Sequence, residues 1–192
     1  MNVFGIKCGE KDIHNIPVGK STNKQIKNRS SLSLKDMYRK QLTKEQAFQK
    51  AKHYCAYQER CHSEVKEKLY SFGLYKTDVE QLLTQLIDED YLNEERFAIQ
   101  FAGGKFRMKQ WGRVKIKYEL KQKGVSEYCI KKALKAIDDE SYEKTLRKLY
   151  EEKLKTLRSE TNHFIRKRKL QDYLMQKGFE LQMIQQFIHN ID

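Results

Sequence analysis

The sequence predicts an all-α fold built from a tandem array of three three-helix repeats. One proline in 192 residues leaves long stretches free for helices, and 39% hydrophobic with 34% charged residues is typical of a soluble, surface-rich protein. Three glycines, Gly73, Gly124 and Gly178, stand 51 and 54 residues apart within similar apolar patterns. This spacing fits three short helices per repeat, and nearest-neighbour contacts predict an elongated or curved array.

Seven positions agree when the three glycines are superposed: the glycine itself and six apolar positions around it. Going from eight before the glycine to thirteen after it, these are Val65, Ile116, Leu170; Leu69, Leu120, Leu174; Leu74, Val125, Phe179; Val79, Ile130, Ile184; Leu83, Leu134, Ile188; and Leu86, Ile137, Ile191. The apolar positions before and after the glycine each follow a helical face. The glycine suits the left-handed residue that ends a helix, and the next apolar residue packs back on the last turn.

A further helix precedes each of these pairs. Thr43 with Gln46 has the pattern of a capping box, Asn93 opens the second such helix, and residues 142–157 supply the third. We therefore expect repeats over the following ranges: 44–92, 93–139 and 140–192.

Two further caps are predicted inside the repeats. Thr77 with Glu80 has the capping-box pattern for the last helix of the first repeat. Ser126 is the expected cap of the corresponding helix in the second repeat.

Residues 1–43 lack sustained periodicity and carry nine Lys or Arg against three acidic residues. This composition predicts a disordered basic tail. Two uses stay open, a solvated tail or an arm that binds nucleic acid.

The formal net charge of +13 favours a polyanion or an acidic protein surface as partner. No stretch has the length and hydrophobicity of a membrane span, and the N-terminus lacks a signal-peptide pattern, so we expect a cytoplasmic protein. The four cysteines show no CxxC spacing and are expected to be reduced thiols. We predict no metal site and no cofactor.

Positive charge concentrates in the second repeat, which has 12 Lys and Arg against 6 Asp and Glu, whereas the first has 7 against 9. Cations at i, i+4 spacing and near a helix start lower helix stability by roughly a few tenths of a kcal/mol per pair. Their presence therefore indicates an external anion or an acidic surface as partner. The predicted basic face comprises Lys105, Arg107, Lys109, Trp111, Arg113, Lys115, Lys117, Lys121, Arg166, Lys167, Arg168 and Lys169. A merely solvated helix face, with Trp111 as a plug between helices, is the alternative.

Enzymatic patterns are absent from the sequence: there is no HExxH, GxSxG or glycine-rich phosphate loop. Gly103 and Gly104 lie inside a helical pattern, and the acidic pairs stand where helix capping explains them. We predict a protein that is not an enzyme.

Residues 93–98 (NEERFA), 105–107 (KFR) and 111–113 (WGR), followed by Glu119-Leu120 and Lys123-Gly124-Val125, resemble the central motif of the RecX family, regulators of RecA recombinase. The segment 54–65 is similar to the family's first-repeat signature. This resemblance implies tandem three-helix repeats and a non-enzymatic regulator that binds RecA and its filament on single-stranded DNA. It further implies limited filament extension and damped recombinase, ATPase and coprotease activities, within homologous recombination, DNA repair and the SOS response.

Other functions stay open. A free-standing DNA- or RNA-binding helical repeat protein is the alternative, since three-helix units with a basic second helix also bind nucleic acid. The expected partners are the RecA filament and single-stranded DNA, with duplex DNA left open, no membrane, and a monomeric state. Whether the filament is inhibited or stimulated is left open as well.

Overall fold

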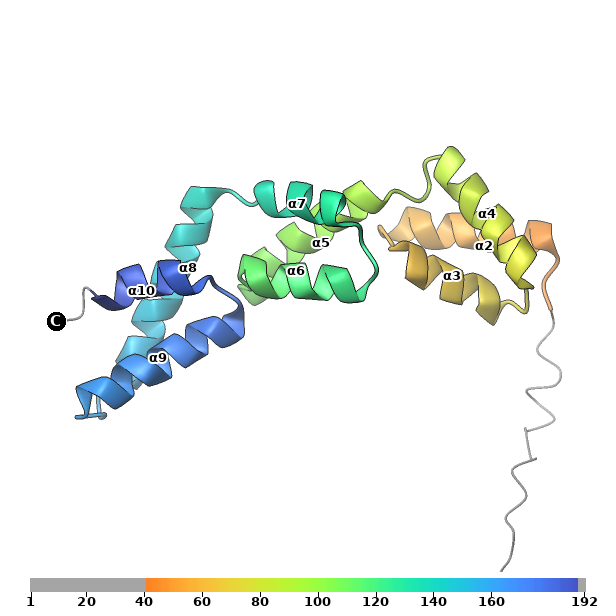
Figure 1. Ribbon diagram of the computed structural model, residues 1–192. Helices are drawn as coiled ribbons and strands as arrows, with labels where there is room; N and C mark the ends of the chain where they lie inside the picture. Colours follow the sequence, from red (N-terminus) through yellow and green to blue (C-terminus); the bar gives the residue numbers. More distant parts are fainter. Residues whose placement is uncertain (1–40, 190–192) are drawn as a thin grey trace, which may run out of the picture. The chain divides into compact units, whose positions relative to one another are not determined.

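The computed structural model describes residues 41–189, which form nine α-helices and no strand (Figure 1). Most of the predicted tail and Ile191 lie outside this range. The all-α repeat prediction is confirmed. The repeat boundaries and the elongated shape stay predictions.

The helices follow one another in three groups of three. Their bounds are α2 Lys44–Tyr57, α3 His62–Ser71 and α4 Lys76–Asp88; α5 Glu94–Lys109, α6 Arg113–Gln122 and α7 Glu127–Lys135; and α8 Asp139–Thr156, α9 His163–Lys177 and α10 Leu181–His189. Within the described residues, every extensively packed pair consists of two helices of the same group. Examples are α5 with α6 and α7, and α9 with α8 and α10. Each group is therefore one helical unit.

The apolar positions of the repeat pattern are the cores of these units. The residues eight and four before each glycine are completely buried: Val65, Ile116, Leu170, Leu69, Leu120 and Leu174. The glycines have φ angles of 85°, 75° and 91°, in the left-handed region. The N–H of Val125 donates to the Leu120 carbonyl (3.1 Å), and the N–H of Phe179 to that of Leu174 (3.2 Å). The predicted glycine turns are confirmed.

Three of the predicted helix caps are confirmed. Thr43 and Gln46 form a capping box at the start of α2. Asn93 accepts a hydrogen bond from the N–H of Arg96, and Ser126 accepts one from the N–H of Cys129.

The predicted capping box of Thr77 with Glu80 is wrong. Helix α4 begins at Lys76 with Tyr75 as its N-cap, so Thr77 already lies inside the first turn. The Glu80 carboxylate instead pairs with the Lys66 ammonium of α3. The pattern predicted the helix but misplaced its start, because Tyr75 adopts the extended N-cap conformation without a side-chain cap.

Helix α8 also starts earlier than predicted. Asp138 caps it by accepting from the N–H of Ser141, so the helix begins at Asp139, three residues before the apolar pattern starts at Tyr142. The first turn is polar and acidic, which suits the positive end of the helix dipole but carries no apolar periodicity.

The described residues form two apolar cores. One lies within α2–α4 and contains residues such as Phe48, Leu69 and Leu86. The other runs from Phe97 to Ile188, through both later units, and includes Cys61 from the start of α3. The second and third units therefore share one core.

Tyr142 is at the centre of the shared core and is completely buried. Its ring lies 5.7 Å from that of Phe106 and 5.0 Å from that of Phe179, between centroids. Its hydroxyl accepts from the backbone N–H of Arg113 (2.8 Å) and donates to the Glu180 carboxylate (2.7 Å). Burial raises the pKa of Tyr142 well above its usual value, so the hydroxyl stays protonated and can donate.

Two glycines bring the backbones of α6 and α9 into direct contact. The N–H of Gly112 donates to the Lys177 carbonyl (2.8 Å), and the N–H of Val114 donates to the Gly178 carbonyl (3.0 Å). A Cβ on Gly112 would lie 2.1 Å from the Gly178 oxygen, and one on Gly178 would lie 2.2 Å from the Lys115 Cβ. Only glycine fits at either position without moving the backbone.

Gly112→Ala should therefore lower the free energy of unfolding by about 1–3 kcal/mol, the usual range for overpacking. Gly104→Ala is the matched control, since its added Cβ would have nothing within 4 Å. The control should keep or gain stability, up to about 1 kcal/mol, because Gly104 lies inside a helix. Denaturant titration followed by circular dichroism measures both. Equal midpoints for Gly112→Ala and the parent would contradict the contact.

Tyr142→Phe keeps the aromatic packing and removes the hydroxyl that joins Arg113 to Glu180. We expect a loss of about 1–3 kcal/mol in unfolding free energy, because the Arg113 N–H and the Glu180 carboxylate lose their partner. Tyr118→Phe is the control, since its ring is 60% exposed on α6. The same denaturant titration measures both, and an unchanged midpoint in Tyr142→Phe would show that the hydroxyl adds nothing to stability.

Candidate binding surface

The end of α5 and the corner after it lie where the sequence placed them. Lys105, Arg107 and Lys109 occupy the last turns of α5, and Gln110 ends the helix with φ 52°. Trp111 and Gly112 then form the corner that leads into α6.

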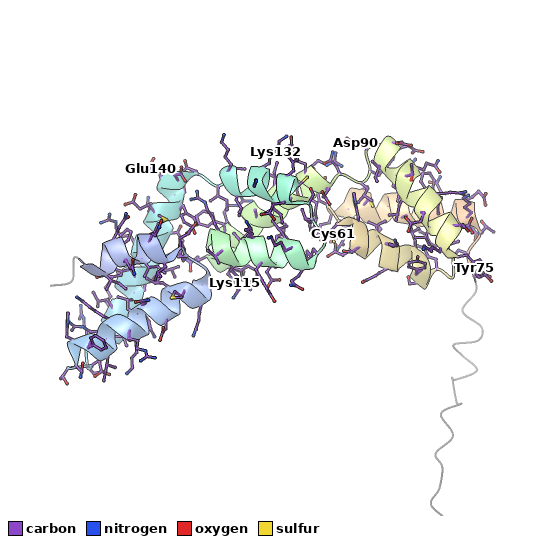
Figure 2. The ribbon with its side chains drawn as sticks, viewed as in Figure 1. Cys61, Tyr75, Asp90, Lys115, Lys132 and Glu140 are labelled. Carbon is purple, nitrogen blue, oxygen red and sulfur yellow. The ribbon has the colours of Figure 1, made fainter. Side chains whose placement is uncertain are left out.

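Trp111 is half-buried and packs against the shared core. The Lys105 ammonium lies 5.1 Å from its ring centroid and the Lys115 ammonium 4.7 Å. Lys115, labelled in Figure 2, stands in the first turn of α6. Packing against the core supports the alternative that Trp111 fills the corner between the helices.

The expectation that folding does not explain Arg113 is wrong. Its guanidinium donates to the Ile137 carbonyl (3.1 Å), pairs with Asp139 and lies 4.2 Å from the Tyr142 ring centroid. The side chain is only 22% exposed. Arg113 therefore fastens α6 to the start of α8.

Lys117 and Lys121 also have an intramolecular partner, which the charge pattern did not reveal. Both pair with the Glu127 carboxylate of α7, at 2.6 and 3.1 Å, and their hydrogen bonds lower the pKa of Glu127. One carboxylate against two ammonium groups leaves a surplus positive charge. Such exposed pairs contribute little to stability, so they can exchange for an external anion.

The four cations of the third repeat lie in the first two turns of α9, which begins at His163. Lys169 pairs with Glu160 at 2.7 Å. Arg168 is exposed, whereas the Nε of Arg166 is buried and has no hydrogen-bond partner. A buried guanidinium donor without an acceptor can bind an anionic oxygen.

Arg166 lines a hollow of about 360 Å³ together with Glu151, Leu154, Lys155 and Arg158. We call Lys155, Arg158 and Arg166 the α8–α9 cluster. Three cations face one carboxylate there, so the cluster favours an anion such as a phosphate. Lys155 and Arg158 were not predicted as site residues, although they stand in a basic run at the end of α8.

The structure does not bring the twelve predicted residues into one surface. Helix α9 meets α6 through its C-terminal end, at Lys177 and Gly178. The α9 residues 166–169 lie two to three turns earlier, roughly 12–16 Å along the helix at 1.5 Å per residue. The predicted basic face is therefore two separate cation clusters.

A second hollow, of about 430 Å³, lies where the loop after α2 meets α5. Its lining combines aromatic, amide and charged side chains: Gln58, Glu59, Glu64, Phe97, Gln100, Phe101, Gly104, Lys105, Met108, Lys109 and Lys123. Lys123 pairs with Glu64 at 2.6 Å, and that hydrogen bond raises the pKa of Lys123. No local sequence pattern predicts this hollow, because its walls come from α5 and from segments up to 65 residues apart.

Residues 41–189 hold no group of three His, Cys, Asp or Glu side chains placed to bind a metal ion. Cys55, Cys61 and Cys129 are buried free thiols, and burial raises the pKa of Cys55 to about 11. A thiol with so high a pKa is a poor nucleophile at neutral pH. In the same range, every helix is too short or too polar to cross a membrane.

Family models match two segments of the chain. Residues 93–134 match the second three-helix domain of RecX, and residues 140–188 match the third. These segments coincide with α5–α7 and α8–α10, the two units that share one core.

Several proteins called regulatory protein RecX are similar to this chain. The one from Pelodictyon phaeoclathratiforme is 36% identical over 128 residues, which are 66% of this chain and 78% of the relative. The one from Clostridium tetani is 33% identical over 117 residues, 60% of this chain but only 53% of the relative. The crystal structure of RecX from Lactobacillus salivarius has a TM-score of 0.69 at 26% identity and covers 78% of this chain and 96% of that one. With the motif at residues 93–125 and both domain matches, this chain belongs to the RecX family of regulatory proteins.

Proposed function

We propose that this protein is a non-enzymatic regulator that binds RecA and its filament on single-stranded DNA. Binding limits filament extension and damps the recombinase, ATPase and coprotease activities. The protein acts in the cytoplasm as a monomer. Family membership supports the regulatory role, and the net charge of +13 suits a filament that contains DNA phosphate.

The α8–α9 cluster carries the DNA part of this proposal. Arg166 has a buried donor without an acceptor, and Lys155 and Arg158 line the same hollow with a single carboxylate, Glu151. Phosphate oxygens supply the missing acceptors. The surplus charge on Lys117 and Lys121 gives a second, weaker contact. Several weak contacts held on one folded body add to a higher overall affinity.

A free-standing nucleic-acid-binding protein is the second candidate, because the same cluster binds phosphate whether or not RecA is present. The decisive measurement is RecA-dependent ATP hydrolysis on single-stranded DNA with this protein at a stoichiometric ratio. The regulator should lower the rate and shorten the filaments seen by electron microscopy. If the rate and the filament length are unchanged and DNA binding is steeply salt-dependent, the free-standing nucleic-acid-binding protein is favoured over the RecA regulator.

Charge reversal tests the α8–α9 cluster directly. Lys155→Glu with Arg158→Glu should weaken binding to the RecA filament at least tenfold. For single-stranded DNA, the slope of log binding constant against log salt concentration should become shallower by about 1.4, because two phosphate contacts are lost. The thermal midpoint should change little, since both side chains are exposed.

The matched control is Lys131→Glu with Lys135→Glu, which makes the same change in net charge on exposed positions of α7. Fluorescence anisotropy at several salt concentrations measures both variants. An equal loss of affinity in the control would show that overall charge, rather than the cluster, drives binding.

A further inference from the structure

The hollow beside α5 contains open space next to a glycine that helix packing does not explain. Gly104 lies in the interior of α5 and lines it. A Cβ on Gly104 would have nothing within 4 Å, whereas one on neighbouring Gly103 would lie 2.8 Å from an Arg107 nitrogen. Glycine inside a helix is less favourable than alanine. No neighbouring atom explains its presence at position 104, and its effect is to widen the hollow.

One wall of the hollow is aromatic and cationic. Phe101 is half-buried, and the ammonium groups of Lys105 and Lys123 lie 5.1 and 5.7 Å from its ring centroid. Lys109 lines the rim and is exposed. A flat aromatic ring can pack beside Phe101 while lysines reach negative charge next to it.

Another lining residue, Glu59, has an acceptor without a donor. Glu59 uses one carboxylate oxygen to accept from the Arg96 Nε at 2.5 Å. Its other oxygen, Oε2, is buried and has no hydrogen-bond partner. Burying an unpaired carboxylate oxygen is unfavourable, so a ligand that brings an N–H donor would be stabilised there. The amides of Gln58 and Gln100 line the same hollow.

We propose that this hollow receives one unstacked base of a single-stranded nucleic acid, which rests on the proposed function. The exocyclic amino group of the base donates to the Glu59 Oε2, the pairing that carboxylates make with cytosine. Its ring packs beside Phe101, and Lys105 and Lys109 contact the adjacent phosphates.

The charges favour a nucleotide over a cationic side chain from a protein partner. The lining holds three lysines against two glutamates, and both glutamates already pair with a cation, Arg96 or Lys123. A guanidinium would meet surplus positive charge, whereas a base with its phosphate brings a donor to Glu59 and negative charge to the lysines.

The test compares two short fluorescent strands of equal length, one of deoxycytidine and one with abasic sites throughout. Both carry the same phosphates. Full-length protein should bind the deoxycytidine strand about tenfold more tightly, within the range that one stacked base contributes. Gly104→Leu fills the hollow and should bind both strands with the affinity of the parent for the abasic one.

Two controls separate occupation of the hollow from loss of fold. Gly104→Ala adds one methyl group and should lower the preference less than Gly104→Leu does, while both Gly104 variants should keep or gain helicity by circular dichroism. Tyr118→Ala removes an exposed aromatic ring from α6, outside the hollow, and should also keep the preference.

Equal binding of the two strands by the parent, or a preference retained in Gly104→Leu, would overturn the base site. RecA-dependent ATP hydrolysis, measured in parallel, tests the proposed function separately. If the parent protein inhibits hydrolysis but shows no strand preference, the proposed regulatory function is supported and the base site is contradicted. If Gly104→Leu loses RecA binding while keeping the strand preference, the hollow takes a protein side chain and the base assignment is wrong.

Discussion

The arrangement of the last two units depends on the contact between Gly112 and Gly178. Two backbone hydrogen bonds cross it, and neither glycine leaves room for a side chain. The Tyr142 hydroxyl lies beside this contact and pairs the Arg113 N–H with the Glu180 carboxylate. Buried polar groups are costly when unpaired, so they hold α6, α8 and α9 in one register and keep the core of the last two units continuous.

The first unit is joined to the second in a different way. Among the described core residues, only Cys61 from α2–α4 enters the shared core. The other contacts are polar: the Ser63 hydroxyl donates to the Lys123 carbonyl at 3.1 Å, and the Glu64–Lys123 and Glu59–Arg96 pairs lie at the same joint. Exposed ion pairs contribute little to stability. The hollow beside α5 lies at this junction and is lined by Glu59, Glu64 and Lys123.

Charge alone was a poor guide to the binding surface. Arg113, Lys117 and Lys121 were assigned to an external anion or acidic surface because their spacing opposes helix stability, yet each has a carboxylate partner within the chain. Arg113 is largely buried in its contacts, whereas the two lysines share one exposed carboxylate and keep a net charge. A donor without an acceptor lies instead in the α8–α9 cluster, where the Arg166 Nε has no partner.

Local spacing sufficed for the helices, the glycine turns and the buried faces, because each depends on residues only a few positions apart. It failed at the start of α4, where Tyr75 takes the N-cap conformation without a side-chain signal. It also could not assign Arg113, whose partners Ile137, Asp139 and Tyr142 stand 24 to 29 residues later. The surplus of cations was visible in the chain. Which cations folding had already paired, and where a cavity remained, depended on contacts between helices that no local pattern records.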